Sequence, residues 1–147
     1  MVLPKDFVCG KEFSPTTQAA VYSYDNISDD VMGFDIGPQT IELFKTHLQT
    51  AQTVVWNGPV GVFEFEQFSK GTKALAQTIS NLSPNTTTII GGGVNAAAVF
   101  KFGLEQNFSH ISTGGGAFWS APEGKPMPGA CMYGETVITT SYFYFIF

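Results

Sequence analysis

Residues 89–98 read IIGGGVNAAA, and this stretch has the pattern of a strand, a tight turn and the start of a helix. Ile89 and Ile90 are β-branched, as in a buried strand, whereas the alanines after Asn95 favour a helix. The glycines between them tolerate positive φ angles and let a ligand approach the backbone closely. Because consecutive amides at a helix N-terminus form a partly positive concavity, the stretch predicts an anion site. Val94, directly after the glycines, has no polar side chain to offer a phosphate or a metal.

Three other stretches also read as strands, and helical stretches separate them along the chain. The four predicted strands cover residues 3–9, 53–59, 86–93 and 109–116, and the predicted helices cover residues 38–51, 64–82 and 95–104. Pro38 suits a first helical turn, and Gly71 is a weak point within the second helix. The alternation predicts parallel strands with right-handed crossovers. The expected fold is therefore α/β, a Rossmann-like, doubly wound parallel sheet with flanking helices.

Glycine loops follow the later strands of this predicted sheet, at the edge where α/β proteins bind ligands. A second triple glycine, Gly114–Gly116, follows the fourth strand as Gly91–Gly93 follows the third. Tight turns in a glycine-rich chain would produce the same pattern without any ligand. Neither loop continues as Gly-Lys-Ser/Thr or fits the GxGxxG pattern. This disfavours a nicotinamide cofactor but allows a nucleotide that is held by backbone amides.

Residues 56–66, WNGPVGVFEFE, follow the second strand and add two candidates at the same edge. The Glu64 carboxylate would accept hydrogen bonds from ribose hydroxyls, and Pro59 would offer an apolar surface to a base. Alternatively, Glu64 is an acid in the first turn of a helix, where the helix dipole favours it. Taken alone, the residues favour this second interpretation.

The composition narrows the range of possible partners. The chain of 147 residues is 44% hydrophobic and 13% charged, which is typical of one globular domain. A net charge of −5 disfavours nucleic acid and anionic membranes as partners. The sequence contains lysines but no arginine, so it lacks the guanidinium groups that usually grip phosphorylated substrates.

Several features predict a cytoplasmic protein. Cys9 and Cys131 lack the CxxC spacing and suggest reduced thiols. Charged residues interrupt any apolar run near the N-terminus, so no signal peptide is expected, and no run reaches the length of a transmembrane helix. An organellar origin stays open, because a transit peptide would precede Met1. His47 and His110 are far apart in the sequence and are expected to be ordinary surface or core residues.

Four stretches together resemble the phosphoglycerate kinase family, in the family's order and spacing. They are VMGFDIGPQTI (31–41), WNGPVGVFEFEQFSKGTKALA (56–76), TTIIGGG (87–93) and SHISTGGGA (109–117). The resemblance runs from about residue 3 to Gly129 and covers the latter part of the family's nucleotide-binding C-terminal domain. It implies a partial domain over residues 1–130 and a divergent aromatic tail over residues 131–147 outside the family fold.

The resemblance also implies an activity and a role for each candidate residue. Family members, usually monomers, transfer a phosphoryl group reversibly between 1,3-bisphosphoglycerate and ADP in glycolysis, giving 3-phosphoglycerate and ATP. The implied nucleoside-binding residues are Gly33, in the adenine pocket, and Asn57, Pro59 and Glu64, with Glu64 on the ribose. The residues that face the nucleotide phosphates and Mg²⁺ are Gly91, Gly92, Gly93, Val94 and Asn95. The catalytic groups are the backbone amides of Gly93, Gly114, Gly115 and Gly116, which stabilise the transferring phosphoryl group.

The chain departs from the family in two ways that affect its activity. The family's N-terminal domain, which binds 3-phosphoglycerate with arginines, is missing, so that substrate site is expected to be absent. Family members carry an aspartate for the metal–nucleotide where this chain has Val94. No protein ligand for Mg²⁺ is therefore expected, and binding of Mg²⁺ with ATP or ADP is weakened or lost. Asn95 is still able to cap the following helix.

Two further stretches differ from the family pattern. Residues 118–122, FWSAP, replace a Ser-Leu-Glu helix start, which a pair of compensating frame errors in the coding sequence would explain. The tail after Ala130 would share that origin. The sequence thus predicts a fragment of a phosphoglycerate kinase that carries part of the ATP/ADP site. The alternative is a non-catalytic nucleotide-binding remnant or truncated gene product without independent activity.

Overall fold

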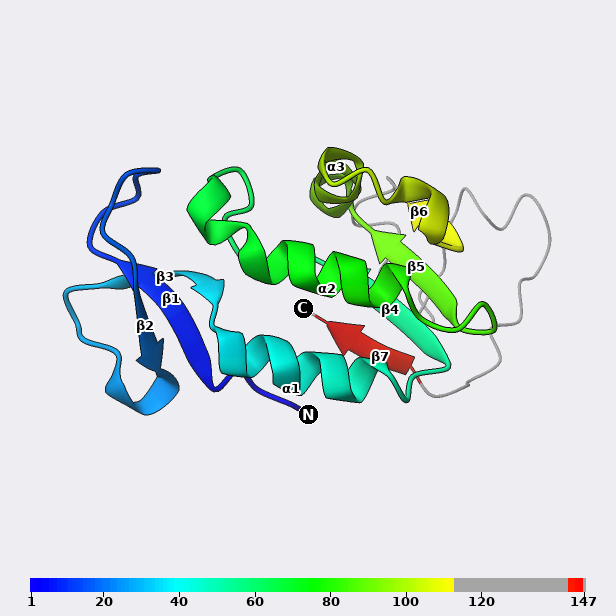
Figure 1. Cartoon of the computed structure of the whole chain (residues 1–147), viewed down its shortest axis with the longest axis horizontal. Coiled ribbons are helices and arrows are strands. Elements are labelled where there is room, and N and C mark those ends of the chain that lie inside the picture. The colour runs from blue at the N-terminus through cyan, green and yellow to red at the C-terminus, as the bar shows by residue number, and fades with distance from the viewer. Residues whose placement is uncertain (113–142, 147) are drawn as a thin grey trace, which may run out of the picture. The chain divides into compact units, whose positions relative to one another are not determined.

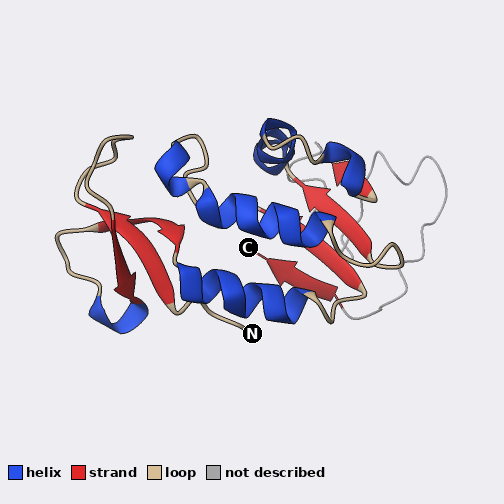
Figure 2. Ribbon diagram, in the orientation of Figure 1, coloured by secondary structure: helices blue, strands red, loops and turns tan. Residues whose placement is uncertain are grey.

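The computed structural model describes residues 1–112 and 143–146 and divides the chain into two compact units. The first unit comprises residues 1–50 and 59–82, and the second comprises residues 51–58 and 83–147. Figure 1 labels the helices and strands, and Figure 2 distinguishes them by type. Each unit contains its own sheet and is described by itself.

The sheet of the first unit is antiparallel and has the strand order β2-β1-β3. Its strands are β1 (Asp6–Gly10), β2 (Ala20–Ser23) and β3 (Met32–Ile36), and a 3₁₀ turn, η1 (Tyr24–Asn26), follows β2. Phe7 of β1 lies opposite Tyr22 of β2 and Ile36 of β3. An irregularity between Val8 and Cys9 shifts the register with β3.

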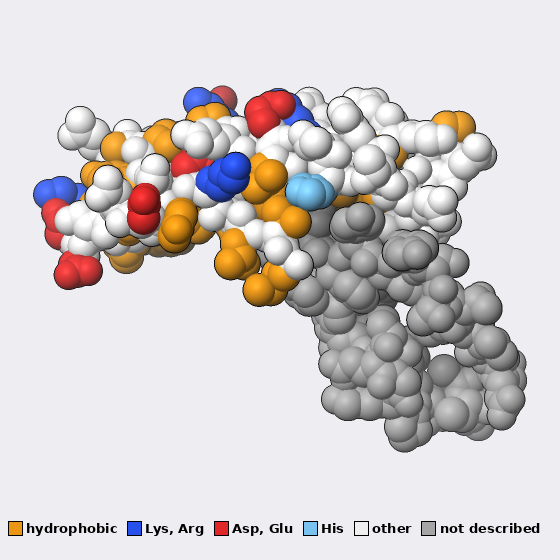
Figure 3. All heavy atoms as spheres, turned by 90° about the horizontal axis from the view of Figure 1, so that it is seen from below, with side chains coloured by type: hydrophobic (Ala, Val, Ile, Leu, Met, Phe, Trp, Pro, Cys, Tyr) orange, Lys and Arg blue, Asp and Glu red, His pale blue; other side chains and the backbone are white. Residues whose placement is uncertain are grey.

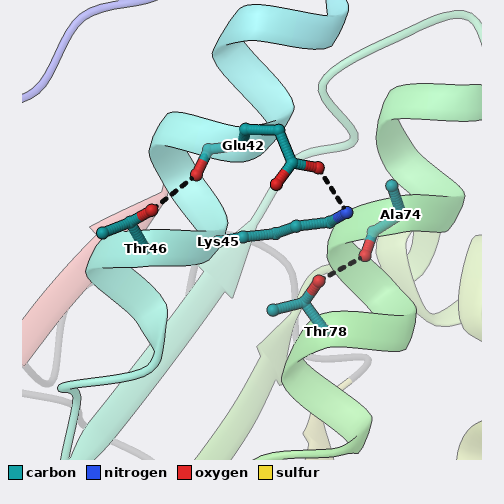
Figure 4. Close-up of polar contacts among 5 residues, drawn as sticks. All are labelled: Glu42, Lys45, Thr46, Ala74 and Thr78. Carbon is teal, nitrogen blue, oxygen red and sulfur yellow. Dashed lines mark hydrogen bonds and ion pairs between the residues drawn. The ribbon is translucent and has the colours of Figure 1, made fainter.

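Two helices, α1 (Pro38–Leu48) and α2 (Lys70–Ser80), pack against each other and lie side by side in Figures 1 and 2. Figure 4 shows Lys45 extending from α1 toward α2, with its ammonium paired to Glu42 at 2.7 Å. Thr46 and Thr78 donate their hydroxyls to the carbonyls of Glu42 and Ala74, one turn earlier in their own helices. Such a surface ion pair within one helix contributes only about 0.2–0.5 kcal/mol to the stability of that helix.

A buried carboxylate from a strand accepts backbone amides at the start of each of these helices. The Asp6 carboxylate accepts hydrogen bonds from the amides of Gln39 and Thr40 at 3.1 and 2.8 Å. The Asp35 carboxylate accepts the amide of Gly71, in the first turn of α2, at 2.7 Å. Carboxylates are favoured there because the first amides of a helix lack partners and the helix dipole is positive. These contacts join α1 to β1 and α2 to β3.

Glycines leave the space that the two carboxylates occupy. A Cβ atom at Gly37 would collide with the Asp6 carboxylate, and one at Gly61 or Gly71 would collide with the Asp35 carboxylate. The prediction that Gly71 weakens the middle of a helix is therefore wrong, since α2 begins at Lys70. Only a short 3₁₀ turn, η2 (Glu66–Phe68), precedes α2.

The sheet of the second unit is parallel and has the strand order β6-β5-β4-β7. Its strands are β4 (Thr53–Asn57), β5 (Thr87–Gly91), β6 (His110–Ser112) and β7 (Phe143–Ile146). Thr88 and Ser109 each donate a backbone amide to the other's hydroxyl at 3.0 Å, which holds the start of β6 against β5. The helix α3 (Gly93–Lys101) packs against β5 and β6 and is followed by a 3₁₀ turn, η3 (Glu105–Asn107).

The α/β class and the parallel sheet are confirmed, but the predicted place of the first strand is wrong. β1 lies in the antiparallel sheet, because β2 and β3 pair with it on either side. The sequence pattern misses β2 because its four residues are mostly exposed, and it misses β3 because Gly33 and Asp35 interrupt the apolar residues. The domain boundary near residue 130 lies outside the described residues and stays a prediction. Among the described helices, none has the length and apolar character needed to cross a membrane.

Candidate functional site

The carboxyl ends of β4 and β5 lie next to each other at one edge of the parallel sheet. Asn57, the last residue of β4, is opposite Gly91, the last residue of β5. The chain then turns at Gly92, whose φ of 87° is a left-handed conformation that favours glycine. A Cβ atom at Gly92 would also lie 3.3 Å from the Asn57 Oδ1 atom and crowd the neighbouring strand end. The left-handed conformation therefore favours a glycine between β5 and α3, and the close approach to Asn57 adds to this preference.

The first turn of α3 follows this glycine directly. Ala96 donates its amide to the Gly92 carbonyl at 3.1 Å, which makes Gly92 the cap residue of α3. No side chain of the described residues caps this helix start, and its first turn contains no acid. Gly93 is exposed, and the Val94 side chain is 56% exposed. The turn is thus a group of backbone amides with a partly positive potential, which suits an anion.

Asn95 connects α3 to the ends of both strands. Its side chain is 1% exposed, and its Nδ2 group donates to the carbonyl of Trp56 at 3.0 Å and to that of Gly91 at 3.2 Å. The Oδ1 atom is buried and accepts no hydrogen bond from the described residues. The prediction that Asn95 caps the helix is wrong, because the cap residue is Gly92 and the Asn95 amide group donates into the sheet. Asn95 therefore acts first as an anchor of the helix start.

The turn after β4 is held by the buried indole of Trp56. Its Nε1 atom donates to the carbonyl of Gly58 at 2.8 Å, and Gly58 has a φ of 94°. The hydrogen bond fixes the direction in which the chain leaves Asn57, whose half-buried side chain lies at the strand end. The sequence pattern indicated a Gly-Pro turn here but did not reveal the role of the indole.

The remaining candidates of the described chain belong to the first unit. Gly33 lies in β3 and is exposed, and a Cβ atom there would make only an ordinary 4.0 Å contact with Phe7. Pro59 is half-buried and Glu64 is exposed. The alternative interpretation of Glu64 as an acid in the first turn of a helix is wrong, because α2 begins at Lys70.

The structure thus brings one subset of the candidates together, within the second unit. These residues are Asn57, Gly91, Gly92, Gly93, Val94 and Asn95. Gly114, Gly115 and Gly116 lie outside the described residues.

The described residues of this edge do not fit a protein-held Mg²⁺. Mg²⁺ requires oxygen ligands, usually including one or two carboxylates, and the first turn of α3 presents the exposed valine Val94 instead. No cluster of three or more His, Cys, Asp or Glu side chains able to hold a metal occurs in the described part of the chain.

On the face drawn in Figure 3, acidic and basic side chains are interspersed among hydrophobic and uncharged ones.

The buried carboxylates Asp6 and Asp35 are not among the site residues that the sequence predicts. Burial raises the pKa of Asp35 from its ordinary value of 3.8 to about 6, against the opposing effect of hydrogen bonds from the amides of Gly71 and Ile36. The sequence does contain a signal for Asp35, because this residue stands between two apolar residues, Phe34 and Ile36, where an unpaired charge would be costly. Both carboxylates serve as caps of helices in the first unit.

A parallel strand, a glycine turn and a helix start without a side-chain cap place the chain in the class of α/β proteins with a parallel sheet. The sequence profile described as phosphoglycerate kinase matches residues 1–125, well over half of the chain. The chain therefore belongs to the phosphoglycerate kinase family.

Individual relatives agree with this assignment. The chain is 91% identical over 133 residues to the phosphoglycerate kinase of Onion yellows phytoplasma (strain OY-M), a match that covers 90% of this chain and 33% of that protein. It is 54% identical over 129 residues to the Enterococcus faecalis (strain ATCC 700802 / V583) protein of the same name, covering 88% of this chain and 32% of that protein. The chain spans about a third of the length of the curated relatives it matches.

Solved structures show the same relation. The structure of phosphoglycerate kinase from Coxiella burnetii matches with a TM-score of 0.80 and 42% sequence identity, covering 84% of this chain and 32% of that one. The crystal structure of the Pyrococcus horikoshii OT3 enzyme matches with a TM-score of 0.71 and 32% identity, covering 85% and 30% of the two chains.

Proposed function

We propose that this chain carries part of the ATP/ADP site of a phosphoglycerate kinase. In the whole enzyme the reaction is reversible phosphoryl transfer between 1,3-bisphosphoglycerate and ADP, giving 3-phosphoglycerate and ATP. The observation that carries the proposal is the juxtaposition of Asn57, the Gly91–Gly93 turn and the first turn of α3 in a member of this family.

The chemistry of this edge is that of phosphate binding by backbone amides. The amides of Gly93 and Val94 would donate hydrogen bonds to phosphate oxygens, and Asn95 would hold the helix start in position through the carbonyls of Trp56 and Gly91. In phosphoryl transfer, positioning and electrostatic stabilisation supply most of the catalysis. The nucleoside would contact Gly33, Asn57, Pro59 and Glu64, and the amides of Gly114, Gly115 and Gly116 would face the transferring group.

Mg²⁺ would reach this site on the nucleotide, where it neutralises phosphate charge. Because Val94 supplies no oxygen ligand, we expect the chain to bind Mg²⁺ with ATP or ADP more weakly than a variant with an acid at this position. Cytoplasmic location, a monomeric state and the lack of nucleic-acid and membrane partners stay predictions.

A thermal-shift titration tests nucleotide binding. A ligand that binds only the native state stabilises it by about 2.7 kcal/mol at a hundred times its Kd, so millimolar Mg-ADP should raise the midpoint of unfolding. Gly92→Ala should abolish this rise, because it forces a side chain into a left-handed conformation at the proposed phosphate turn. Gly103→Ala is the matched control, because Gly103 has a φ of 66° with open space around it and lies after α3.

Both variants should unfold at lower temperature without ligand, because both strain the backbone. Only Gly103→Ala should keep the shift with Mg-ADP. The absence of any shift in the parent chain would refute the nucleotide site, and an unchanged shift in Gly92→Ala would place the nucleotide elsewhere.

A further inference from the structure

The strand β4 has a neighbour on each side, and one of these neighbours comes from the C-terminal tail. On one side β4 pairs with β5. On the other side it pairs in parallel with β7, so that Thr53 is opposite Phe143 and Trp56 is opposite Ile146. Figure 1 shows β7 in red beside β4. The family profile ends at residue 125, so β7 lies beyond the part of the chain that the profile covers.

β4 has the character of a central strand. Val54 and Trp56 are fully buried, and Val55 is 3% exposed. Successive residues of a parallel strand direct their amides and carbonyls alternately to the two sides. Pairing with β5 therefore satisfies only half of these groups, and the other half would lie unpaired at the edge of a buried strand. Buried backbone groups without partners are costly, so β4 needs a second strand.

The tail has the composition that such a strand needs. Residues 143–146 are Phe-Tyr-Phe-Ile, all with high β propensity, and the last seven residues of the chain carry no charged side chain. An uncharged segment of this kind is an aggregation hazard when it is exposed, and an open strand edge is a second such hazard. Pairing of β7 with β4 covers the edge of the buried strand β4 and gives the tail one hydrogen-bonded neighbour.

We propose that β7 is an edge strand that the chain supplies to its own sheet. Residues 143–146 pair with the side of β4 that faces away from β5. The tail is then a structural part of the second unit although it lies outside the family profile. Its presence keeps β4 from pairing with a strand of another chain.

Amide hydrogen exchange tests this proposal within one strand. The full chain is compared with a chain that ends at residue 141, and exchange is followed residue by residue by NMR. In the shortened chain, alternate amides of β4 should exchange about tenfold faster or more, because they face the missing strand. The amides between them face β5 and should stay protected, which makes each half of the strand the control for the other. Unchanged protection of every β4 amide would overturn the proposal.

The full-length chain supplies a second measurement in case the shortened chain fails to fold. Nuclear Overhauser contacts are expected between the backbone protons of residues 53–56 and those of residues 143–146. A mixture of differently labelled chains shows whether these contacts arise within one molecule, as we expect. Contacts only between molecules, or none, would refute the pairing within the chain.

Two proline variants probe the pairing from the tail itself. Tyr144 and Phe145 are neighbours in β7, so one of their amides faces β4 and the other points away from it. Proline at the position that faces β4 removes a ladder hydrogen bond and should lower the unfolding midpoint by about 4 °C or more relative to the other variant. If Tyr144→Pro and Phe145→Pro both unfold at the parent midpoint, β7 does not pair with β4.

Discussion

At the scale of single residues, two buried carboxylates of the first unit act as helix caps. Asp6 and Asp35 come from strands, yet each accepts the amides of a helix that follows later in the chain. The neighbouring glycines are conditions of this arrangement, since an alanine at Gly37 or Gly71 would collide with a carboxylate. A carboxylate placed there by tertiary contacts is invisible to rules that look for caps next to the helix in sequence.

The raised pKa of Asp35 leads to a prediction about stability and pH. The native carboxyl titrates at about 6, whereas the same group in the unfolded chain titrates near its ordinary value of 3.8. The native state therefore binds the proton of this carboxyl more tightly than the unfolded state does. Ionisation of Asp35 between these two pKa values lowers the free energy of unfolding. The contribution of Asp35 to the free energy of unfolding should be largest below pH 4 and fall by up to about 3 kcal/mol as the pH rises to about 6.

Chemical denaturation of the parent and of Asp35→Asn between pH 4 and 7 measures this effect. The stability of the parent relative to the variant should decrease over pH 4–6 and become constant above it. Asp29→Asn removes an exposed carboxyl and serves as the control. A difference between parent and Asp35→Asn that does not change with pH would contradict the prediction.

Among the elements, the start of α3 is the one on which the proposed nucleotide site depends most. Its cap is a glycine in a left-handed conformation, and Asn95 ties its first turn to β4 and β5. Val94 is 56% exposed, so a charged residue at this position would lose little of its hydration. A negative charge at this place would interact favourably with the helix dipole.

Val94→Asp is therefore expected to stabilise the protein by about 0.3–1 kcal/mol at low ionic strength. In Val94→Asn the asparagine has nearly the same shape as the aspartate but no charge. The difference in unfolding free energy between the two variants therefore isolates the electrostatic effect. The gain should shrink at high salt, because the charge is exposed. If the proposed nucleotide site forms, Val94→Asp should also tighten binding of Mg-ADP more than binding of ADP alone, since only the former contains the cation. Equal stability of the Asp and Asn variants at low salt would refute the dipole argument.

At the scale of the whole molecule, the chain corresponds to about a third of its relatives. The proposed nucleotide site in the second unit consists of the ends of β4 and β5 and the start of α3. The candidate residues that the structure describes are assigned to the nucleotide, and none of them to phosphoglycerate. Phosphoryl transfer requires both substrates to be held together, with water excluded from the reacting groups.

We predict that the purified chain will not convert Mg-ATP and 3-phosphoglycerate above background in an assay coupled to NADH oxidation. Co-expression with the remaining two thirds of the Onion yellows phytoplasma relative tests whether the two pieces complement each other, and the intact relative is the positive control. Turnover by the chain alone would refute the prediction, and turnover only in the co-expressed sample would show that the chain supplies a functional part of the site.

The α/β class, the family and the strand–glycine–helix unit at residues 89–98 follow from the sequence alone, because they depend on local patterns of residue types. It also located the strands around residues 53–57 and 87–91 and the Pro38 start of α1. Apolar side chains that alternate predict strands, apolar side chains at helical spacing predict helices, and glycines mark the turns between them. Each of these patterns spans only a few residues and is therefore visible in the sequence.

The pairing of the strands and the roles of individual polar residues, in contrast, depend on the three-dimensional fold. β1 joined an antiparallel sheet because β2 and β3 pair with it, and β7 came to lie beside β4 from far along the chain. Asn95 became an anchor, and Asp35 became a helix cap with a raised pKa, through partners 36 to 39 positions away. Hydrogen bonds and burial of this kind depend on distances in space, which the order of residues does not record.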